Sequence, residues 1–345
     1  MKGENGELTL QGDGFGPLRA GPRTTHAGHD AVEHAGLHVP EETRVKSTIK
    51  RIIPKGIRRG VRKVARRLEL RRMRARNPSV AKSQLVRDLT ALGLETGDLL
   101  YVHSSLRALG FVDGGADTVI DALLDTVGPE GTLVFPTFTL VRGMKETLEA
   151  RDHVFDPESS PSTVGKITNC FRARPGVRRS EHPTHSVAAL GPLARELTET
   201  HLEEGMNFGK GTPFDKILRH GGKVVGLGVN FSPITFYHVF EEFNPEKFPG
   251  VYLPHAFPAK IKVGDNIREV KVRCHDPVFH QQRIDKVPAI ESYFSSYYHS
   301  EGVAHVGKVG NGSAPSWWIR AADVMQCLDK LYSRGITIYK TPNLD

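Results

Sequence analysis

Short apolar runs of strand length alternate with amphipathic, helix-length segments through the middle of this chain. The runs are LLYVHSS, GTLVFPTFT and GGKVVGLGVN, and each follows a stretch whose apolar residues recur at steps of three or four. Leu85, Leu89 and Leu92 form the first such stripe. Regular alternation of helix and strand is typical of layered α/β proteins, so the pattern predicts an α/β fold.

The same periodicities predict elements further along the chain. A long loop rich in Asp, Pro and Ser is expected after GTLVFPTFT and before residue 164. Additional strands are expected at VAALG and within IKVGDNIREVKVRC. Additional helices are expected at 164–172, 212–220, 234–243, 287–298 and 319–333.

Composition narrows the class of protein. With 38% apolar and 25% charged residues over 345 positions, the chain can bury the core of one large or two ordinary domains. It has no run of eighteen apolar residues, and its N-terminus lacks the basic cap and apolar stretch of a secretory signal. The three cysteines, Cys170, Cys274 and Cys327, are too few and too scattered for a disulfide framework or a four-cysteine zinc site. We therefore expect a cytoplasmic protein with no metal.

The net charge of +8 comes from one segment. Residues 46–76 carry fourteen Lys or Arg and one acid, a net of +13, so the rest of the chain balances to −5. Apolar residues in this segment recur at helical spacing, beginning with Ile49 and Ile53. The chain is therefore expected to have a disordered leader (1–45), a basic amphipathic helical arm (46–76) and a main domain (77–345).

The basic arm has three interpretations. It could be a solvated tail, which is the simplest, or a helix that lies peripherally on an anionic membrane. Contact with nucleic acid is the weakest of the three, because no aromatic residues are interleaved for base stacking. The oligomeric state stays open.

The first candidate site follows the first strand of the main domain. There His103-Ser104-Ser105-Leu106-Arg107 releases hydroxyl side chains into a turn, and backbone N–H groups at such a turn can hold phosphate oxygens. Arg107 could pair with a phosphate. Serines after a strand more often simply end it, so this pattern alone is a weak indication.

A second cluster of polar residues lies in RRSEHPTHS, at 178–186. His182 and His185 are of a type that binds metals, but no spaced Cys or acid completes a ligand set. A structural loop is the better interpretation.

A third candidate is the segment TFYHVFEE, which follows the strand VVGLGVN. On a helix, His238 and Glu241 share a face, so the carboxylate could fix the tautomer of the imidazole, with Glu242 as a rival partner. Open α/β sheets place their sites beyond the carboxyl ends of strands, and His is the commonest general base. A lone His–Glu pair on a helix is more often structural.

Taken together, these stretches resemble the aminoglycoside 3-N-acetyltransferase family. The resemblance runs in order from about residue 80 to 243, and the C-terminal segment is similar more loosely. The matching stretches are LVRDLTALGLETGDLLYVHSSLRALGFVDGGADTVIDALLDTVGPEGTLVFPTFT, FDPESSPSTVGKI, RRSEHPTHSVAALG, GKGTPFDKIL, GGKVVGLGVN and ITFYHVFEE.

The resemblance implies an α/β/α sandwich around a mixed sheet and acetyl-CoA as cosubstrate. It implies that His238 is the catalytic base and that Glu241 supports it. The residues that it implies at the coenzyme A site are Ser104, Ser105, Leu106, with Arg107 beside them, and Ser186.

The expected activity is direct acetyl transfer to a primary amine of an aminoglycoside or an amino sugar. Three departures from the family pattern bear on this expectation. No acid stands just before GGKVVGLG, and Asp276 is only the nearest candidate for the further acid expected in VRCHDPV. The segment NPEKFPGVYLP is aromatic and Pro-rich, whereas family members that act on aminoglycosides have acids that hold the polycation. These departures slightly favour an amino sugar as acceptor. They also motivate an alternative, a catalytically inactive CoA-binding or membrane-associated protein on the same scaffold.

Overall fold

The computed structural model describes residues 78–150, 152–202 and 206–341, which fall within the unit Ala65–Asp345. The expected leader (1–45) and basic arm (46–76) lie outside the described residues, so both stay predictions. Within the described residues, no helix combines the length and the apolar character needed to cross a bilayer.

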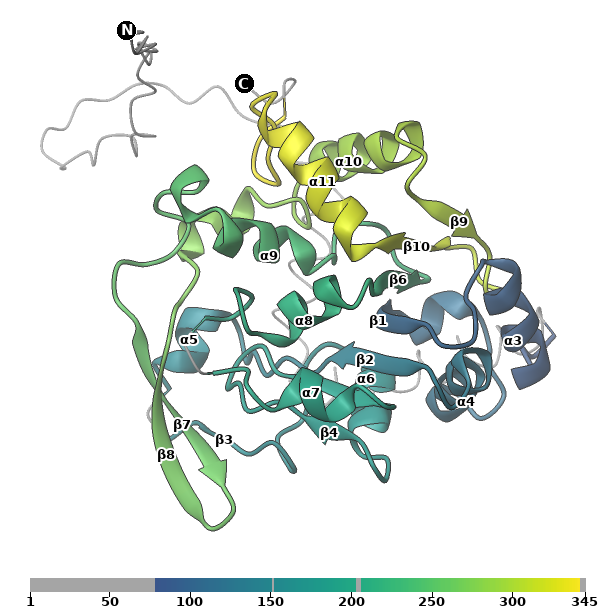
Figure 1. Ribbon diagram of the computed structural model, residues 1–345, viewed down its shortest axis with the longest axis horizontal. Helices are drawn as coiled ribbons and strands as arrows, with labels where there is room; N and C mark the ends of the chain where they lie inside the picture. The colour runs from purple at the N-terminus through teal and green to yellow at the C-terminus, as the bar shows by residue number, and fades with distance from the viewer. Residues whose placement is uncertain (1–77, 151, 203–205, 342–345) are drawn as a thin grey trace, which may run out of the picture. The chain divides into compact units, whose positions relative to one another are not determined.

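The centre of the domain is a seven-stranded mixed sheet (Figure 1). Its strands are β1 (Leu99–Ser104), β2 (Thr132–Pro136), β4 (Arg178–Arg179), β5 (Val187–Leu190), β6 (Lys223–Leu227), β9 (His305–Gly307) and β10 (Ser316–Arg320). Their order is β4-β5-β2-β1-β6-β10-β9. β1 pairs in parallel with β2 and β6, whereas β5 and β10 run antiparallel to their inner neighbours.

Helices cover both faces of this sheet. Along β1 the side chains alternate, so that Leu99 and Tyr101 join one apolar cluster while Leu100 and Val102 join another. The first cluster includes α7 (Ala194–Thr198), α8 (Pro213–Arg219), α9 (Phe236–Phe243), α10 (Pro288–Ser300) and α11 (Ala321–Tyr332). The second includes α3 (Lys82–Ala91), α4 (Ala116–Val127) and α6 (Lys166–Arg172). The predicted α/β/α sandwich around a mixed sheet is confirmed.

A glycine in β6 admits a large side chain from the neighbouring strand. Gly226 pairs with Trp317 of β10, and a Cβ atom at Gly226 would lie 2.2 Å from the Trp317 ring. Trp317 is fully buried, and its indole N–H donates to the carbonyl of Val229 at 2.7 Å. This glycine of the GLGV stretch therefore serves close packing.

A smaller three-stranded sheet lies beside the main one. It contains β3 (Val154–Phe155), β7 (Phe257–Val263) and β8 (Asn266–Val272), and β7 and β8 form the long hairpin at the side of the domain in Figure 1. α5 (Met144–Leu148) packs against it through Leu148. The end of β8 leads directly into residues 273–276, which contribute to the candidate site.

Most predicted elements are confirmed, with two corrections. The last helix was expected from Ile319, but residues 316–320 form β10 and the helix begins at Ala321. The strand was missed because it passes into α11 without a turn, which leaves no boundary signal in the sequence. The loop expected before residue 164 contains α5 and β3.

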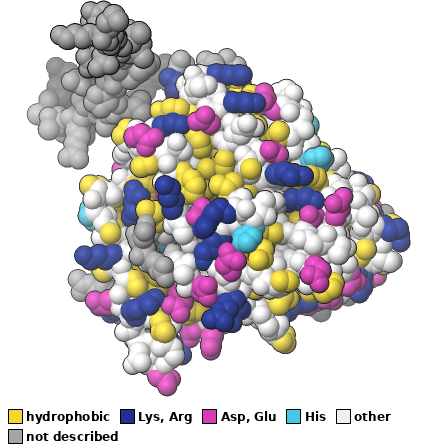
Figure 2. Space-filling view, viewed as in Figure 1, with side chains coloured by type: hydrophobic (Ala, Val, Ile, Leu, Met, Phe, Trp, Pro, Cys, Tyr) yellow, Lys and Arg dark blue, Asp and Glu magenta, His cyan; other side chains and the backbone are white. Residues whose placement is uncertain are grey.

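On the face shown in Figure 2, Lys and Arg side chains are interspersed with Asp and Glu. Residues 77–345 hold 29 Lys or Arg and 31 Asp or Glu, a net of −2, and this small excess is not gathered into an acidic field on this face. Long-range attraction of cationic molecules requires such a field. This face of the domain is therefore not expected to attract them over long distances.

Candidate active site

The first element of the candidate site is α9, which is anchored to the central sheet. The hydroxyl groups of Tyr101 in β1 and Thr235, at the N-cap position of α9, lie 3.0 Å apart within hydrogen-bonding distance. The helix buries its apolar side chains together with Glu241, whereas His238 stays partly exposed. The buried apolar residues of α9 are Phe236, Tyr237, Val239 and Phe240.

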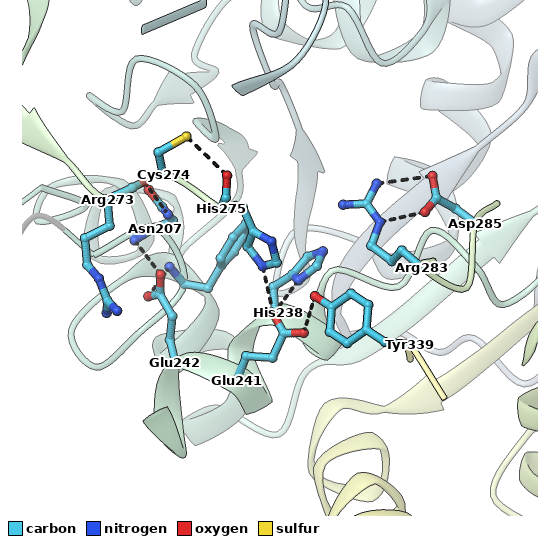
Figure 3. Close-up of polar contacts among 11 residues, drawn as sticks. Asn207, His238, Glu241, Glu242, Arg273, Cys274, His275, Arg283, Asp285 and Tyr339 are labelled. Atoms are coloured by element: carbon cyan, nitrogen blue, oxygen red, sulfur yellow. Dashed lines mark hydrogen bonds and ion pairs between the residues drawn. The ribbon is translucent and has the colours of Figure 1, made fainter. Parts of the chain in front are cut away.

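Glu241 is the centre of a hydrogen-bonded cluster (Figure 3). Its Oε2 atom lies 2.7 Å from Nδ1 of His238 and 3.0 Å from Nε2 of His275. Its Oε1 atom accepts a hydrogen bond of 2.8 Å from the hydroxyl of Tyr339. The Glu241 side chain is 1% exposed, whereas the two imidazoles are 16% and 15% exposed. The cluster is thus a buried carboxylate beneath two partly accessible rings.

The surroundings of Glu241 favour its ionised form. Burial alone would raise the pKa of the Glu241 carboxyl, yet His238 and His275 hold this pKa well below its usual range. Burial lowers the pKa of His238, and Glu241 opposes this lowering. An ionised carboxylate only accepts hydrogen bonds, so the neutral His238 ring carries its proton on Nδ1 and leaves Nε2 as a base.

Glu242, the rival partner of His238, points to other groups. It accepts hydrogen bonds from the backbone N–H groups of Asn207 at 3.3 Å and Phe208 at 2.8 Å. Burial raises the pKa of its carboxyl, although these bonds oppose the rise. The structure therefore pairs His238 with Glu241, as the three-residue spacing suggested.

The sequence did not reveal His275 as a member of this cluster. Asp276, the expected acid in this segment, instead accepts a hydrogen bond from the N–H of Val278 at 3.0 Å and caps η3 (Pro277–Gln281). His275 comes from a segment 34 residues beyond Glu241. No local spacing links the two, and the only signal was a polar His-Asp pair three residues after the end of a strand.

His238, Glu241 and His275 form the one group with metal-ligand atoms within 4.8 Å of one another among the described residues. Tetrahedral zinc with bonds of about 2.0 Å holds its ligand atoms roughly 3.3 Å apart. The 2.7 and 3.0 Å separations are shorter than this and match hydrogen bonds to a carboxylate. The geometry thus fits a hydrogen-bonded cluster better than a metal centre.

Most of the residues expected at the coenzyme lie at or directly after the carboxyl end of β1. Ser104 ends β1 beside Leu227, the last residue of β6, and Ser105 donates its N–H to the carbonyl of Leu227 at 2.9 Å. Leu106 and Arg107 begin η1 (Leu106–Leu109), and within the described residues their N–H groups bond to no backbone carbonyl. Over the part of the chain that the structure describes, the turn thus presents two N–H groups without a backbone acceptor and an exposed Arg107 side chain.

Ser186 lies in a different environment from the turn. It is fully buried, and its hydroxyl donates to the carbonyl of Thr137 at 2.9 Å and accepts from Nε of Arg179 at 3.0 Å. The Arg179 guanidinium also donates to the carbonyls of Thr137 and Ser160, each at 2.6 Å. The hydroxyl of Ser186 is therefore already engaged within a hydrogen-bonded core.

His182 and His185 are buried, as a structural role predicts. Nδ1 of His182 accepts the N–H of His185 at 2.9 Å, and His185 packs edge-on against Phe208 with ring centroids 4.9 Å apart. Phe208 in turn lies 5.4 Å from the His238 ring. Burial holds the pKa of both imidazoles well below 6.5. These neutral rings thus belong to the buried packing around Phe208, which contacts His238.

The sequence of this chain is similar to those of curated aminoglycoside N(3)-acetyltransferases. Over 161 residues the chain is 42% identical to an aminoglycoside N(3)-acetyltransferase III of Acinetobacter baumannii, a stretch of 44% of this chain and 56% of that relative. The chain thus matches little more than half the length of that curated protein.

Solved structures extend the similarity across the fold. The structure described as AAC-IIIb in binary complex with CoASH is 26% identical, with a TM-score of 0.61, and the match covers 76% of this chain and 99% of that one. AAC-VIa bound to sisomicin is also 26% identical with a TM-score of 0.61, covering 74% and 98% of the two chains. In addition, the family model for aminoglycoside 3-N-acetyltransferases matches residues 101–333. The chain therefore belongs to the aminoglycoside 3-N-acetyltransferase family.

Proposed function

We propose that this protein is an acetyl-CoA-dependent N-acetyltransferase that acetylates a primary amine of an aminoglycoside or an amino sugar by direct transfer. Family membership supports this reaction class. Two similar structures are described with CoASH and with sisomicin, which supports both proposed substrates. His238 is the general base in this proposal.

The observation that carries the proposal is the hydrogen bond between His238 and an ionised, buried Glu241. At 2.7 Å the carboxylate accepts the Nδ1 proton, which leaves a lone pair on Nε2. Burial keeps the His238 pKa below 6.5, so the ring is uncharged at neutral pH. An oriented, uncharged and partly exposed imidazole is the form that a general base requires.

The proton transfer follows from this geometry. Acetyl-CoA, when bound, supplies the thioester that the neutral amine attacks. Nε2 of His238 takes the proton that the amine nitrogen loses as the new C–N bond forms, and Glu241 stabilises the resulting imidazolium. His238 then returns this proton toward the departing thiolate, so the ring ends neutral. No protein nucleophile takes part.

The turn after β1 suits the phosphates of coenzyme A. The N–H groups of Leu106 and Arg107 have no backbone acceptor in the described part of the chain. With the hydroxyls of Ser104 and Ser105 they would supply donors to pyrophosphate oxygens, and Arg107 would add positive charge. A direct contact from Ser186 stays a prediction, because its hydroxyl already bonds to Thr137.

Release of free thiol from acetyl-CoA tests the proposal. Aminoglycosides and amino sugars are compared as acceptors, and His238→Ala is expected to lower turnover by about 10²–10⁴-fold while CoA binding persists. His280→Ala, an exposed histidine of η3, is the matched control and is expected to retain full turnover. Full turnover in His238→Ala would remove the base role. Thermal stabilisation by CoA without thiol release from any amine would instead support the inactive scaffold.

A further inference from the structure

Two imidazoles share one oxygen of Glu241, and only one of them belongs to the proposed reaction. We infer that His275 is a positioning residue that holds the Glu241 carboxylate in place and thereby sets the basicity of His238. The inference rests on the proposed function for its kinetic consequences. Its structural basis is the pair of contacts at 2.7 and 3.0 Å to the same Oε2 atom.

A helical His–Glu pair does not by itself fix the carboxylate. Glutamate has three side-chain torsions, and an i,i+3 contact contributes only a few tenths of a kcal/mol. Here two donors from outside α9 hold the group: His275 bonds Oε2 and Tyr339 bonds Oε1. With both oxygens held, the orientation of the carboxylate toward His238 does not depend on the helical pair alone.

The segment that carries His275 is itself rigidly placed. Its neighbours form antiparallel backbone bonds, from the N–H of Leu253 to Cys274 at 2.9 Å and from the N–H of Asp276 to Val251 at 2.8 Å. The Tyr252 ring packs against the His275 ring with centroids 4.7 Å apart. His275 is therefore a fixed donor, as a positioning role requires.

The two rings also affect each other's charge. Their centroids lie 4.8 Å apart, so a proton on His275 disfavours a proton on His238. Arg283 also lowers the pKa of His238, and His238 in turn lowers the pKa of the buried His185. The other titratable or charged groups around the cluster are Glu241, Glu242, Arg273, Tyr252 and Tyr339.

Removal of His275 therefore has two consequences. The Glu241 carboxylate loses a donor that holds its orientation, which lowers the rate, and His238 loses a neighbour that opposes its protonation, which raises the pKa of His238. We expect the acid limb of the kcat/KM profile to move to higher pH by about one unit in His275→Ala, since a charge at this distance shifts a pKa by that order. At pH 7, kcat/KM is expected to fall about tenfold, part of the 10²–10⁴-fold that a general base supplies.

The kinetic experiment uses the same amine throughout, so that substrate ionisation is common to all proteins. His275→Gln retains an N–H donor to Oε2 and is expected to recover most of the lost rate, while His280→Ala in the same segment leaves the profile unchanged. A merely structural role would lower the rate without moving the acid limb. An unshifted limb in His275→Ala would overturn the inference.

Nuclear magnetic resonance of ¹⁵N-labelled histidines separates this inference from the proposed function. In the wild-type protein we expect His238 as the Nδ1–H tautomer and His275 as the Nε2–H tautomer, because both rings donate to Oε2 of Glu241. The Nδ1–H tautomer at His275 would overturn the inference even if His275→Ala does not fold. If no amine releases thiol but both tautomers are as expected, the proposed function fails and the positioning role stands.

Discussion

Acidification is expected to unfold this protein through its buried histidines. Burial lowers the pKa of His103 from 6.5 to about 3 and that of His201 from 6.5 to about 4. His103 is 7% exposed and leaves Nε2 without a partner among the described residues, while His201 bonds Ser180 and Asn207 in its neutral form. Neither ring can gain a proton in the folded state near pH 5.

The direction of the effect follows from proton linkage. Between pH 6.5 and the folded pKa values, the unfolded chain binds more protons than the folded chain, so stability present above pH 6.5 is lost as pH falls. Compared with pH 8, the lowered pKa values of His103 and His201 each reduce the free energy of unfolding at pH 5 by about 2 kcal/mol, or about 4 kcal/mol together. This is a large part of a typical stability of about 5–15 kcal/mol.

Other ionisable groups have smaller effects in this pH range. The lowered pKa values of Asp156 and Asp285, both about 2, matter mainly below pH 4.5, where unfolded carboxylates take up protons. Burial raises the pKa of Glu242, which opposes the histidine effect. The loss between pH 7 and pH 5 therefore reports mainly the buried imidazoles, to which His182 and His185 add in the same direction.

Urea denaturation at pH 8, 7, 6 and 5 measures this dependence. His103→Phe removes one titrating ring. Its free energy of unfolding should therefore fall by about 2 kcal/mol less than that of the wild type between pH 8 and pH 5, whatever its stability at pH 8. His255→Phe, at an exposed position, is the matched control and should keep the wild-type dependence. Equal losses in wild type and His103→Phe would refute the reasoning.

Three further perturbations test the packing and the site. Gly226→Ala should cost about 1–3 kcal/mol by overlap with the Trp317 ring, and Trp317→Leu should recover part of this in a double-mutant cycle; simple additivity would contradict the packing argument. Arg179→Lys should lower the free energy of unfolding by about 2 kcal/mol in denaturant titrations. The reason is that an ammonium cannot replace a guanidinium that bonds several carbonyl and hydroxyl oxygens. Arg178→Lys, at an exposed position, is the control and should leave the free energy of unfolding unchanged. Tyr339→Phe removes the donor on Oε1 of Glu241 and should lower kcat about 3–10-fold with an unchanged KM for acetyl-CoA; unchanged kcat would show that this bond is dispensable.

The sequence predicted the layered fold because its buried strands are continuous apolar runs bounded by glycine or polar turns. It could not predict β10, whose residues Ser316–Arg320 run straight into a helix, or β3 and β4, which are two residues long. Such strands exist because a neighbouring strand supplies their hydrogen bonds. The sequence of the segment alone does not indicate this pairing.

The candidate site shows the same limit. The pair His238 and Glu241 was visible because both lie on one helix at a spacing that shares a face. The choice against Glu242 came from the backbone N–H groups of Asn207 and Phe208, which only the folded chain brings to it. His275 was invisible for the same reason, since its contact depends on how the end of β8 returns past residues 251–253.

The carboxylates around His238 constrain which acceptor the site can hold. Glu241 already accepts hydrogen bonds from three side-chain donors, Glu242 from two backbone N–H groups, and Asp285 from Arg283 at 2.6 and 3.1 Å. Each of these carboxylates therefore has fewer acceptor positions left for a second cationic group. A polycationic acceptor is expected to use carboxylates outside this set as well, whereas an acceptor with a single amine needs only Nε2 of His238 in the proposed reaction. In the proposed function, the choice between an aminoglycoside and a simpler amino sugar thus depends on side chains beyond the cluster of His238, Glu241 and His275.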